Sequence, residues 1–594
     1  MKTDGRRQRS VKAAEHIVEG HGVAPGIAIG RAFVVEHGIS QVPEYNIGSA
    51  EVAAECQRFN EAVTYSQRQV GKLQDKARRL SGAAAEELGY ILEANLQMLT
   101  GSRLVRGVED RIGRQRINAE AAVQAEMADI AQSFSAIGDP YLAGRMQDIN
   151  DVGMRLIRSL TNTPYKALSG LPEGTVVIAE EITPADTALM DPARIAGFAT
   201  ALGGAESHTA IVARSLGLPA VLGAADVVTA VKTGDTVVVD GGRGRIVVNP
   251  GSRTKARFRQ RRQELAREQR LLARLRDLPA RSRDGVEVTL QANLELPLEL
   301  DMVNQVGAAG IGLLRSEFFF MNRDDLPSQD EQYTALSSLV EGMAGRPVTI
   351  RTLDVGGEKL APALGQHFAA STNPALGLRA IRLSLKVRSL LEDQLAAMLR
   401  AGAHGPVRIL LPMITTPGEV VQVREVLKRV ARRLKRRGQA IAAPLPPLGV
   451  LIEVPAAALA ADGLAQVADF FSIGTNDLTM YTLAIDRSDE QMADQFNSLH
   501  PAVIRLVGHS IEAARQAGIP INICGEMAGE PRYTALLLGL GLRDLSMAAT
   551  ALPRVKQRIR ALDVSEAARR SQTILEQHDS GRIAAMLDDL NALI

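Results

Sequence analysis

The chain has 594 residues, of which 46% are hydrophobic and 23% are charged, and its formal net charge is +2. This length exceeds what one hydrophobic core can organise, so we expect several domains. The near-neutral charge argues against nucleic acid as the main partner, and two cysteines cannot form a disulfide framework. Without an apolar signal core or a bilayer-long apolar run, the sequence predicts a cytoplasmic protein with no membrane insertion.

The first 252 residues read as an α/β domain that is interrupted by a helical region. Residues 20–44 form a turn-and-strand entry, and residues 45–165 are rich in Ala, Glu, Gln, Arg and Leu with few prolines, which predicts helices. Residues 166–252 return to strand patterns and form a compact α/β domain. Its expected strands are Thr175–Ala179, Pro219–Gly223, Thr236–Asp240 and Arg245–Val248.

One histidine in this α/β domain lies between a glycine turn and an apolar, helix-like run. Gly203 and Gly204 allow tight turning, and His208 is expected at the N-terminus of the helix that follows. Free N–H groups and the helix dipole favour an anion there, and a neutral imidazole can carry a phosphoryl group as a nucleophile. For a histidine on its own, a capping or core role is the simpler interpretation.

Residues 253–285 are rich in arginine and are expected to form a linker helix that ends at Pro279. A nucleic-acid patch is the alternative interpretation. We favour a solvated helix because glutamates interrupt the basic residues and aromatic stacking residues are nearly absent.

Residues 286–594 alternate strand-like and helical segments in a regular way. The number of units and the length match a (β/α)8 TIM barrel, in which the active site lies at the C-terminal ends of the strands. The expected strands are Val286–Asn293, Ile311–Glu317, Val348–Val355, Val407–Ile414, Leu448–Val454, Phe470–Asn476, Ile521–Gly525 and Leu545–Ala548.

Chemistry-bearing residues cluster where those strands end. Arg315, Arg351 and Arg487 would bring guanidinium groups to one mouth, and such forks suit phosphate and carboxylate oxygens. Glu453 and Asp477 come from neighbouring strands and suit Mg²⁺ beside a phosphate, although they could instead only neutralise the arginines. Other polar residues at these ends are Glu317, Asp354, Asn476 and Glu526, and Arg379 in a later loop is a further phosphate contact to consider.

Cys524 also lies at a strand end, in Ile521-Asn522-Ile523-Cys524-Gly525-Glu526. A buried apolar role is usual for a free cysteine. Close to cations, however, its thiol could act as a proton donor.

Several of these segments resemble, in the same order, the Enzyme I family of the bacterial sugar phosphotransferase system, the phosphoenolpyruvate–protein phosphotransferases. The resemblance covers nearly the whole chain. It rests on the His208 loop, Gly310-Ile311-Gly312-Leu313-Leu314-Arg315-Ser316-Glu317-Phe318, Arg351-Thr352-Leu353-Asp354-Val355-Gly356-Gly357, Ile452-Glu453-Val454-Pro455-Ala456-Ala457, Phe471-Ser472-Ile473-Gly474-Thr475-Asn476-Asp477-Leu478-Thr479 and Cys524-Gly525-Glu526.

The resemblance implies a role for each of these residues. His208 would be the phosphorylated histidine and Cys524 the donor that protonates the pyruvate enolate. Phosphoenolpyruvate would be held by Arg315, Arg351, Asn476, Asp477 and Arg487, and Mg²⁺ by Glu453 and Asp477. The helical region would dock the phosphocarrier protein HPr, and the barrel would form a homodimer.

Three residues depart from the family pattern. Glu206 replaces a small hydroxyl or amide residue two positions before the histidine, Asn95 stands where many members have histidine, and Met480 replaces a polar residue. A carboxylate at position 206 should repel a phosphoryl group unless a cation offsets it. A catalytically weakened regulator or scaffold that binds phosphorylated partners without turnover is therefore one rival interpretation, and Glu206 is its only support.

Two further rivals share the histidine and barrel domains. A pyruvate phosphate dikinase or phosphoenolpyruvate synthase relative would need an ATP-binding domain, for which the residues ahead of position 166 leave no room. A nitrogen-related Enzyme I would carry an N-terminal sensory domain, and the residues before His21 are too few for one. The pattern thus favours a carbohydrate or general system, although neither the pathway nor the preferred carrier can be read from it.

Overall fold

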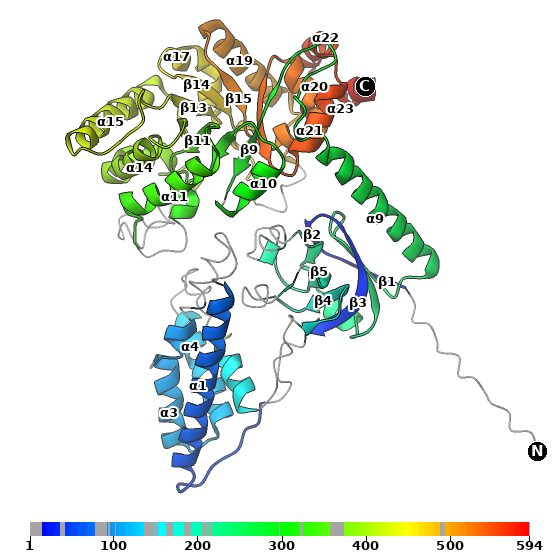
Figure 1. Ribbon diagram of the computed structural model, residues 1–594, viewed down its shortest axis with the longest axis vertical. Coiled ribbons are helices and arrows are strands. Elements are labelled where there is room, and N and C mark those ends of the chain that lie inside the picture. Colours follow the sequence, from blue (N-terminus) through cyan, green and yellow to red (C-terminus); the bar gives the residue numbers. More distant parts are fainter. Residues whose placement is uncertain are drawn as a thin grey trace, which may run out of the picture. The chain divides into compact units, whose positions relative to one another are not determined.

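The structure is a computed structural model, and the chain divides into two compact units, Met1–Glu268 and Gln269–Ile594, which are described separately (Figure 1). It describes residues 15–35, 42–77, 92, 95–100, 102–135, 149, 152–161, 170–182, 190–191, 193–204, 209–210, 213, 217–295, 297–320, 325–356, 373–486, 492 and 495–592. Glu206, His208 and Arg487 lie outside these described residues.

The first unit contains an eight-stranded sheet in the order β1-β8-β7-β3-β4-β5-β6-β2. Neighbours from β3 to β6 are parallel, and the other pairs are antiparallel. The elements are β1 (His16–Glu19), β2 (His21–Ala24), β3 (Ile27–Val35), β4 (Thr175–Ala179), β5 (Ile195–Thr200), β6 (Ala220–Leu222), the short helix α8 (Val227–Ala230), β7 (Thr236–Asp240) and β8 (Arg245–Val248). The strands predicted at β4, β6, β7 and β8 are confirmed, whereas β1 and β5 were not predicted.

The sheet is covered on both faces, because alternate residues of its central strands enter different cores. Val177 and Phe198 belong to one buried cluster, and Val176 and Ile178 to another. Strands that are buried on both faces read as continuous apolar runs, which is why β4 was visible in the sequence.

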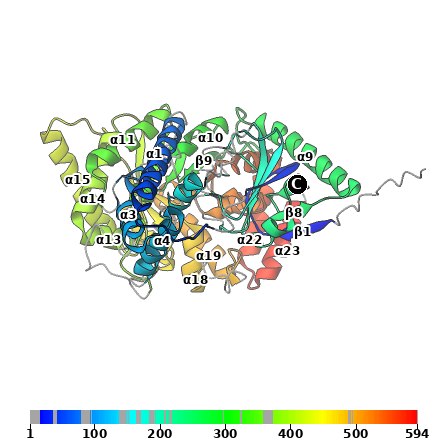
Figure 2. The same ribbon diagram turned by 90° about the horizontal axis from the view of Figure 1, so that it is seen from below.

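Three long helices lie side by side between β3 and β4 in the chain (Figures 1 and 2). They are α1 (Val52–Ala77), α3 (Arg103–Gln115) and α4 (Ala119–Ser135), and residues 95–98 and 152–160 are also helical. In α3, Leu104, Val108 and Ile112 recur every four residues and are buried together. The predicted helical segment is therefore an insertion between neighbouring strands of the sheet.

The arginine-rich segment forms α9 (Ser252–Ala273), which ends before Pro279 and so is shorter than predicted. The chain directly after the helix forms turns. Lys556 Nζ holds these turns by donating hydrogen bonds to the carbonyl oxygens of Leu275 at 3.1 Å and Arg276 at 2.8 Å. The helix is not solvated on all sides, because Phe258 packs in a buried cluster with residues of the sheet.

The second unit is built on a closed barrel of eight parallel strands, as predicted. The order is β10-β11-β12-β13-β14-β15-β16-β9, with β9 and β16 closing the ring. The strands are β9 (Thr289–Leu294), β10 (Ile311–Leu314), β11 (Val348–Arg351), β12 (Val407–Leu411), β13 (Leu448–Ile452), β14 (Phe470–Ile473), β15 (Ile521–Ile523) and β16 (Asp544–Ala548).

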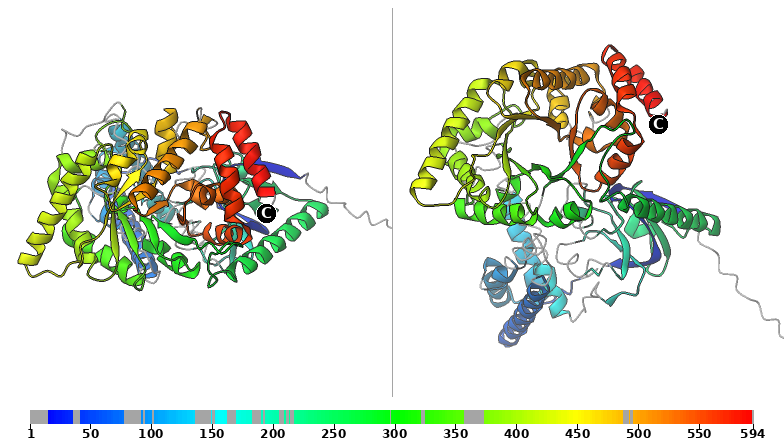
Figure 3. Two further views of the ribbon diagram at one scale, coloured as in Figure 1. Left: turned by 90° about the horizontal axis from the view of Figure 1, so that it is seen from above. Right: turned by 45° about the horizontal axis from the view of Figure 1, so that its top comes forward.

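Helices surround the strands, as the right-hand view of Figure 3 shows. The longer ones are α11 (Gln329–Gly342), α14 (Arg388–Ala401), α15 (Pro417–Arg436), α18 (Thr475–Leu483), α19 (Pro501–Ala517), α20 (Pro531–Gly539), α21 (Leu552–Ala561), α22 (Val564–Leu575) and α23 (Ser580–Ala592). Shorter ones are η2 (Pro297–Glu299), α10 (Leu300–Gln305), η3 (Glu317–Phe319), α13 (Ala380–Lys386), α16 (Pro455–Leu459), α17 (Ala461–Ala465) and η7 (Glu526–Gly529).

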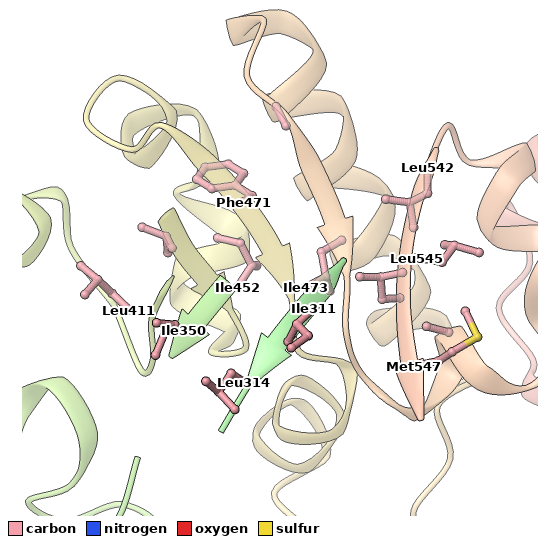
Figure 4. Close-up of a cluster of buried hydrophobic side chains, with 14 of the residues drawn as sticks. Ile311, Leu314, Ile350, Leu411, Ile452, Phe471, Ile473, Leu542, Leu545 and Met547 are labelled. Carbon is pink, nitrogen blue, oxygen red and sulfur yellow. The ribbon is translucent and has the colours of Figure 1, made fainter. Parts of the chain in front are cut away.

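The main core of this unit includes side chains that alternate along the strands, among them Ile350, Ile452 and Phe471 (Figure 4). The opposite side chains of the strands form a smaller buried cluster, in which Leu451 and Phe470 meet Cys524. Because all eight strands run the same way, their C-terminal ends open on one face. The fold class expected from the sequence is confirmed. None of the described helices is long and apolar enough to cross a membrane.

Candidate active site

Charged side chains converge at the C-terminal ends of β10, β11, β13 and β14. Arg351 is the last residue of β11, and Glu317 and Glu453 follow β10 and β13 within a few residues. Asp477 lies in the first turn of α18, directly after β14. The predicted strands extended past the C-terminal ends of the real ones at these points, and Glu317 and Glu453 lie in the added residues.

Arg351 is the central cation of this mouth, with 9% of its surface exposed. Its guanidinium donates to Glu317 Oε1 at 3.0 Å and forms an ion pair with Asp354 Oδ2, also at 3.0 Å. Burial alone would lower the pKa of Arg351, but the Glu317 and Asp354 carboxylates outweigh burial and raise it. Its buried Nε has no hydrogen-bond partner. The arginine is thus permanently charged and fixed in orientation.

Asp354 joins two arginines. Its Oδ1 accepts a hydrogen bond from Arg379 at 2.8 Å, while Oδ2 faces Arg351. Burial would raise the pKa of Asp354, but these two cations lower it below the ordinary value. Arg379, which the sequence offered only as a further phosphate contact, is thereby brought to the same cluster from the residue before α13.

Three carboxylates form the acidic side of the mouth. Oxygens of Asp354, Glu453 and Asp477 all lie within 4.8 Å of one another. Glu453 is 2% exposed, and its Oε1 accepts a 2.7 Å hydrogen bond from the backbone N–H of Met413, a residue with φ of +56°. Burial raises the pKa of Glu453 well above its ordinary value, and the charges of Asp354 and Asp477 raise it further. Carboxylates packed this closely favour either a proton or a cation between them.

Two other predicted contacts have protein partners. Arg315 forms an ion pair with Glu295, and 39% of its side chain remains exposed. Asn476 exchanges two hydrogen bonds with Glu526, donating from Nδ2 at 2.9 Å and accepting at Oδ1 from the backbone N–H at 3.0 Å. The Asn476–Glu526 hydrogen bonds link the first turn of α18 to the start of η7.

Cys524 lies just below the mouth, 5% exposed, in the apolar interior of the barrel. Burial raises the pKa of its thiol to about 11, against a smaller opposing effect of the Ser472 hydroxyl. Near neutral pH the group is therefore a thiol with a proton to give. The next residue has to be glycine, because a Cβ at Gly525 would lie 1.9 Å from Thr475 Oγ1.

Known proteins match the chain along its length. Three family models match: PEP-utilising enzyme, N-terminal, over residues 19–145; the mobile domain of PEP-utilising enzymes over 171–244; and their PEP-binding domain over 269–564. Similar relatives include the phosphoenolpyruvate-protein phosphotransferases of Cupriavidus necator (41% identity; 90% of this chain and 93% of the relative), Geobacillus stearothermophilus (38%; 94% and 96%) and Bacillus subtilis (35%; 96% and 99%).

The chain belongs to the phosphoenolpyruvate-protein phosphotransferase family. It is therefore an enzyme with a phosphoenolpyruvate-dependent phosphotransferase role, and the mouth described above falls within the stretch that matches the PEP-binding domain. The stretch that matches the mobile domain includes position 208. Of the residues near it, 209, 210 and 213 are helical, as expected, while His208 itself lies outside the described residues.

Gln394 was not predicted from the sequence as a residue of the site, although its hydrogen bonds hold two loops of the mouth in place. Gln394 is a buried residue of α14; its Nε2 donates to Ser316 Oγ at 3.0 Å, and its Oε1 accepts from the backbone N–H of Leu353 at 2.9 Å. It thereby fixes the loops that carry Glu317 and Asp354. The available signal was a polar residue at a position where α14 is otherwise apolar.

Proposed function

We propose that this chain moves the phosphoryl group of phosphoenolpyruvate first to its own His208 and then to a histidine of an HPr-type carrier protein. The observation that supports this most is the buried pairing of Arg351 with Glu317 and Asp354 at the barrel mouth. Phosphoryl transfer depends mainly on positioning and on neutralising charge, and fixed guanidinium groups serve both needs.

In this proposal the arginines hold the anionic substrate. Arg351 binds it from a fixed position, and Arg315, which is partly exposed, exchanges its contact with Glu295 for one with the substrate. Asn476 and Asp477 contribute from the first turn of α18, and Arg487 is a further expected contact that lies outside the described residues.

The acidic side of the mouth suits Mg²⁺. The close approach of the Asp354, Glu453 and Asp477 oxygens fits a hard divalent cation, and the buried Oε2 of Glu317 has no hydrogen-bond partner. We propose Glu453 and Asp477 as the ligands, with Asp354 close enough to assist. When bound, Mg²⁺ would neutralise charge on the phosphoryl oxygens.

Cys524 would complete the reaction. Loss of the phosphoryl group leaves the enolate of pyruvate, whose methylene carbon has to gain a proton. The buried thiol keeps its proton near neutral pH, because its pKa is raised to about 11, and can donate it there.

The protein partners rest on the family alone. We propose that the carrier docks on the helical region of α1, α3 and α4, that the barrel forms a homodimer, and that the enzyme works in the cytoplasm. His208 owes its proposed role to the Gly203–Gly204 turn before it and to the helix-like run after it.

The proposal is tested by incubating the purified protein with labelled phosphoenolpyruvate and Mg²⁺, with and without a purified HPr-type carrier. We expect one acid-labile phosphohistidine, which passes its label to the carrier and is absent from His208→Ala. His404→Ala is the matched control. The His404 ring forms an ion pair with Glu341 at 2.6 Å and a hydrogen bond with Tyr333 at 2.9 Å, and we expect this variant to be labelled as the parent is. Label that persists in His208→Ala, or that comes from ATP instead, contradicts the proposal.

A further inference from the structure

Inside the barrel, one hydroxyl group is directed at the thiol of Cys524. Ser472, fully buried in β14, donates a hydrogen bond from Oγ to Cys524 Sγ at 3.2 Å. Among the residues that the structure describes, it is the one side chain hydrogen-bonded to this sulfur, since in the other contact Sγ itself donates to the backbone oxygen of Ile473, at 3.7 Å. The apolar side chains that form a buried cluster with Cys524 include Leu451 and Phe470.

The backbone of Cys524 is fixed by other groups. Its N–H donates to the carbonyl oxygen of Ile473 at 3.0 Å, and its carbonyl oxygen accepts from Asn293 Nδ2 at 2.9 Å. Asn293 is in turn held by Ser546, whose Oγ donates to Asn293 Oδ1 at 2.6 Å. The Ser472 hydroxyl is therefore not needed to hold the chain at this point, and its contact acts on the sulfur itself.

A donor at the sulfur has two consequences. It occupies one lone pair, which restricts the directions in which the S–H bond can point. It also becomes a charge-assisted hydrogen bond once the sulfur is a thiolate, and such bonds are about twice as strong as neutral ones. Among the described residues Ser472 is the one side chain that donates a hydrogen bond to this sulfur, so the part of the gain that comes from hydrogen bonding depends on it.

We propose that Ser472 is a positioning residue that restricts the direction of the Cys524 S–H bond and stabilises the thiolate left after proton transfer. The inference rests on the proposed function, in which this thiol protonates the enolate. In the step, the S–H bond breaks and a C–H bond forms at the methylene carbon with the electron pair of the enolate double bond. The enolate oxygen returns to a carbonyl, the negative charge moves to sulfur, and water later reprotonates the thiolate.

The first test measures the thiol without any substrate. In a Cys56→Ser background, Cys524 is the single cysteine, and its reaction with the small neutral reagent methyl methanethiosulfonate follows the thiolate fraction. We expect Ser472→Ala to react about tenfold more slowly at a fixed pH, since hydrogen bonds to charged groups are among the strong ones. Ser510→Ala, which removes a buried hydroxyl that donates to the backbone oxygen of Leu506 within α19 at 2.8 Å, is the matched control and should react at the parent rate.

The direction of the effect separates this role from a packing role. Loosened packing would open access to a buried thiol and speed the reaction, so an equal or faster rate in Ser472→Ala overturns the proposal. The second test measures turnover: Ser472→Ala should lower kcat for pyruvate formation about tenfold, within the range of a general acid, and leave KM for phosphoenolpyruvate unchanged. Slower modification with unchanged kcat would also overturn it, whereas failure of the proposed function would appear as missing His208 label in the parent protein.

Discussion

The Asp354 carboxylate offers the sharpest test of how the mouth is held together. Asp354→Asn keeps the shape but removes the charge that pairs with Arg351 at 3.0 Å and Arg379 at 2.8 Å. Removing one partner of a buried ion pair costs about 3–5 kcal/mol, because the remaining charge stays buried without compensation. Arg351 keeps Glu317 at 3.0 Å, so we expect the lower end, about 3 kcal/mol.

Calorimetry of the full chain measures this loss in the unfolding transition of the barrel. About 1 kcal/mol moves the melting temperature of a large domain by about 2 °C, so we expect a drop of about 6 °C. Asp588→Asn is the control: Asp588 bonds Arg532 at 2.7 and 2.9 Å, but 60% of its side chain is exposed. Exposed pairs contribute about 0–1 kcal/mol, so this variant should melt close to the parent protein.

The pH dependence of the difference has a definite sign. Because the arginines lower the pKa of Asp354, its stabilising effect is present above the ordinary value of 3.8 and is lost as the pH falls through the lowered value. The gap between parent and variant should be full near neutral pH and should close in acid. An Asp354→Asn protein as stable as the parent at pH 7, or a gap that does not change with pH, would refute this account of the ion pairs.

Three other outcomes follow from the same mouth. Glu453→Gln should raise the melting temperature measured without Mg²⁺, because it removes a buried carboxylate that is repelled by its neighbours. The same variant should lose any stabilisation by added MgCl2, and if Mg²⁺ still stabilises it as strongly as the parent, Glu453 is not a ligand. Arg351→Lys should reduce phosphohistidine labelling about 10²–10³-fold, since a single ammonium cannot replace a fork that bonds two carboxylates, and labelling at the parent rate would remove Arg351 from the site. Gly525→Ala should lower the rate of pyruvate formation, because the added Cβ would displace Thr475. Gly463→Ala is the control: the atom nearest to its added Cβ is 3.8 Å away, so the rate should not change. Equal rates in both variants would contradict the crowding argument.

The sequence predicted the barrel well because its strands are continuous apolar runs that end in charged residues. The same reasoning overlooked β5, Ile195–Thr200, whose sequence Ile-Ala-Gly-Phe-Ala-Thr includes two alanines and a glycine, residue types that are depleted in strands. It overlooked β1, His16–Glu19, because four residues are too few for alternation to be recognised. Both strands are defined mainly by their neighbours in the sheet.

The residues of the site also include some that the sequence indicated and some that it did not. Arg351 and Glu453 could be recognised because Arg351 is the last residue of β11 and Glu453 directly follows β13, and that position alone directs them to the mouth. The pairing of Arg379 with Asp354 could not be predicted, because Arg379 follows no strand and reaches the mouth only through the tertiary fold. Likewise, nothing local indicates that Asn476 and Glu526 bond each other across two loops.

Closure of the barrel by β9 and β16 also decides when the enzyme becomes functional during its synthesis. Thr289 of β9 pairs with Asp544 of β16. The first barrel strand to be synthesised therefore cannot complete its pairing until the last strand has been synthesised. Until then β9 and β15 each have an open backbone edge, and such edges are templates for pairing with other chains. Contacts this distant in sequence also form slowly. A substitution in β16 that delays closure would therefore lower the yield of folded enzyme while leaving the turnover of each folded molecule untouched.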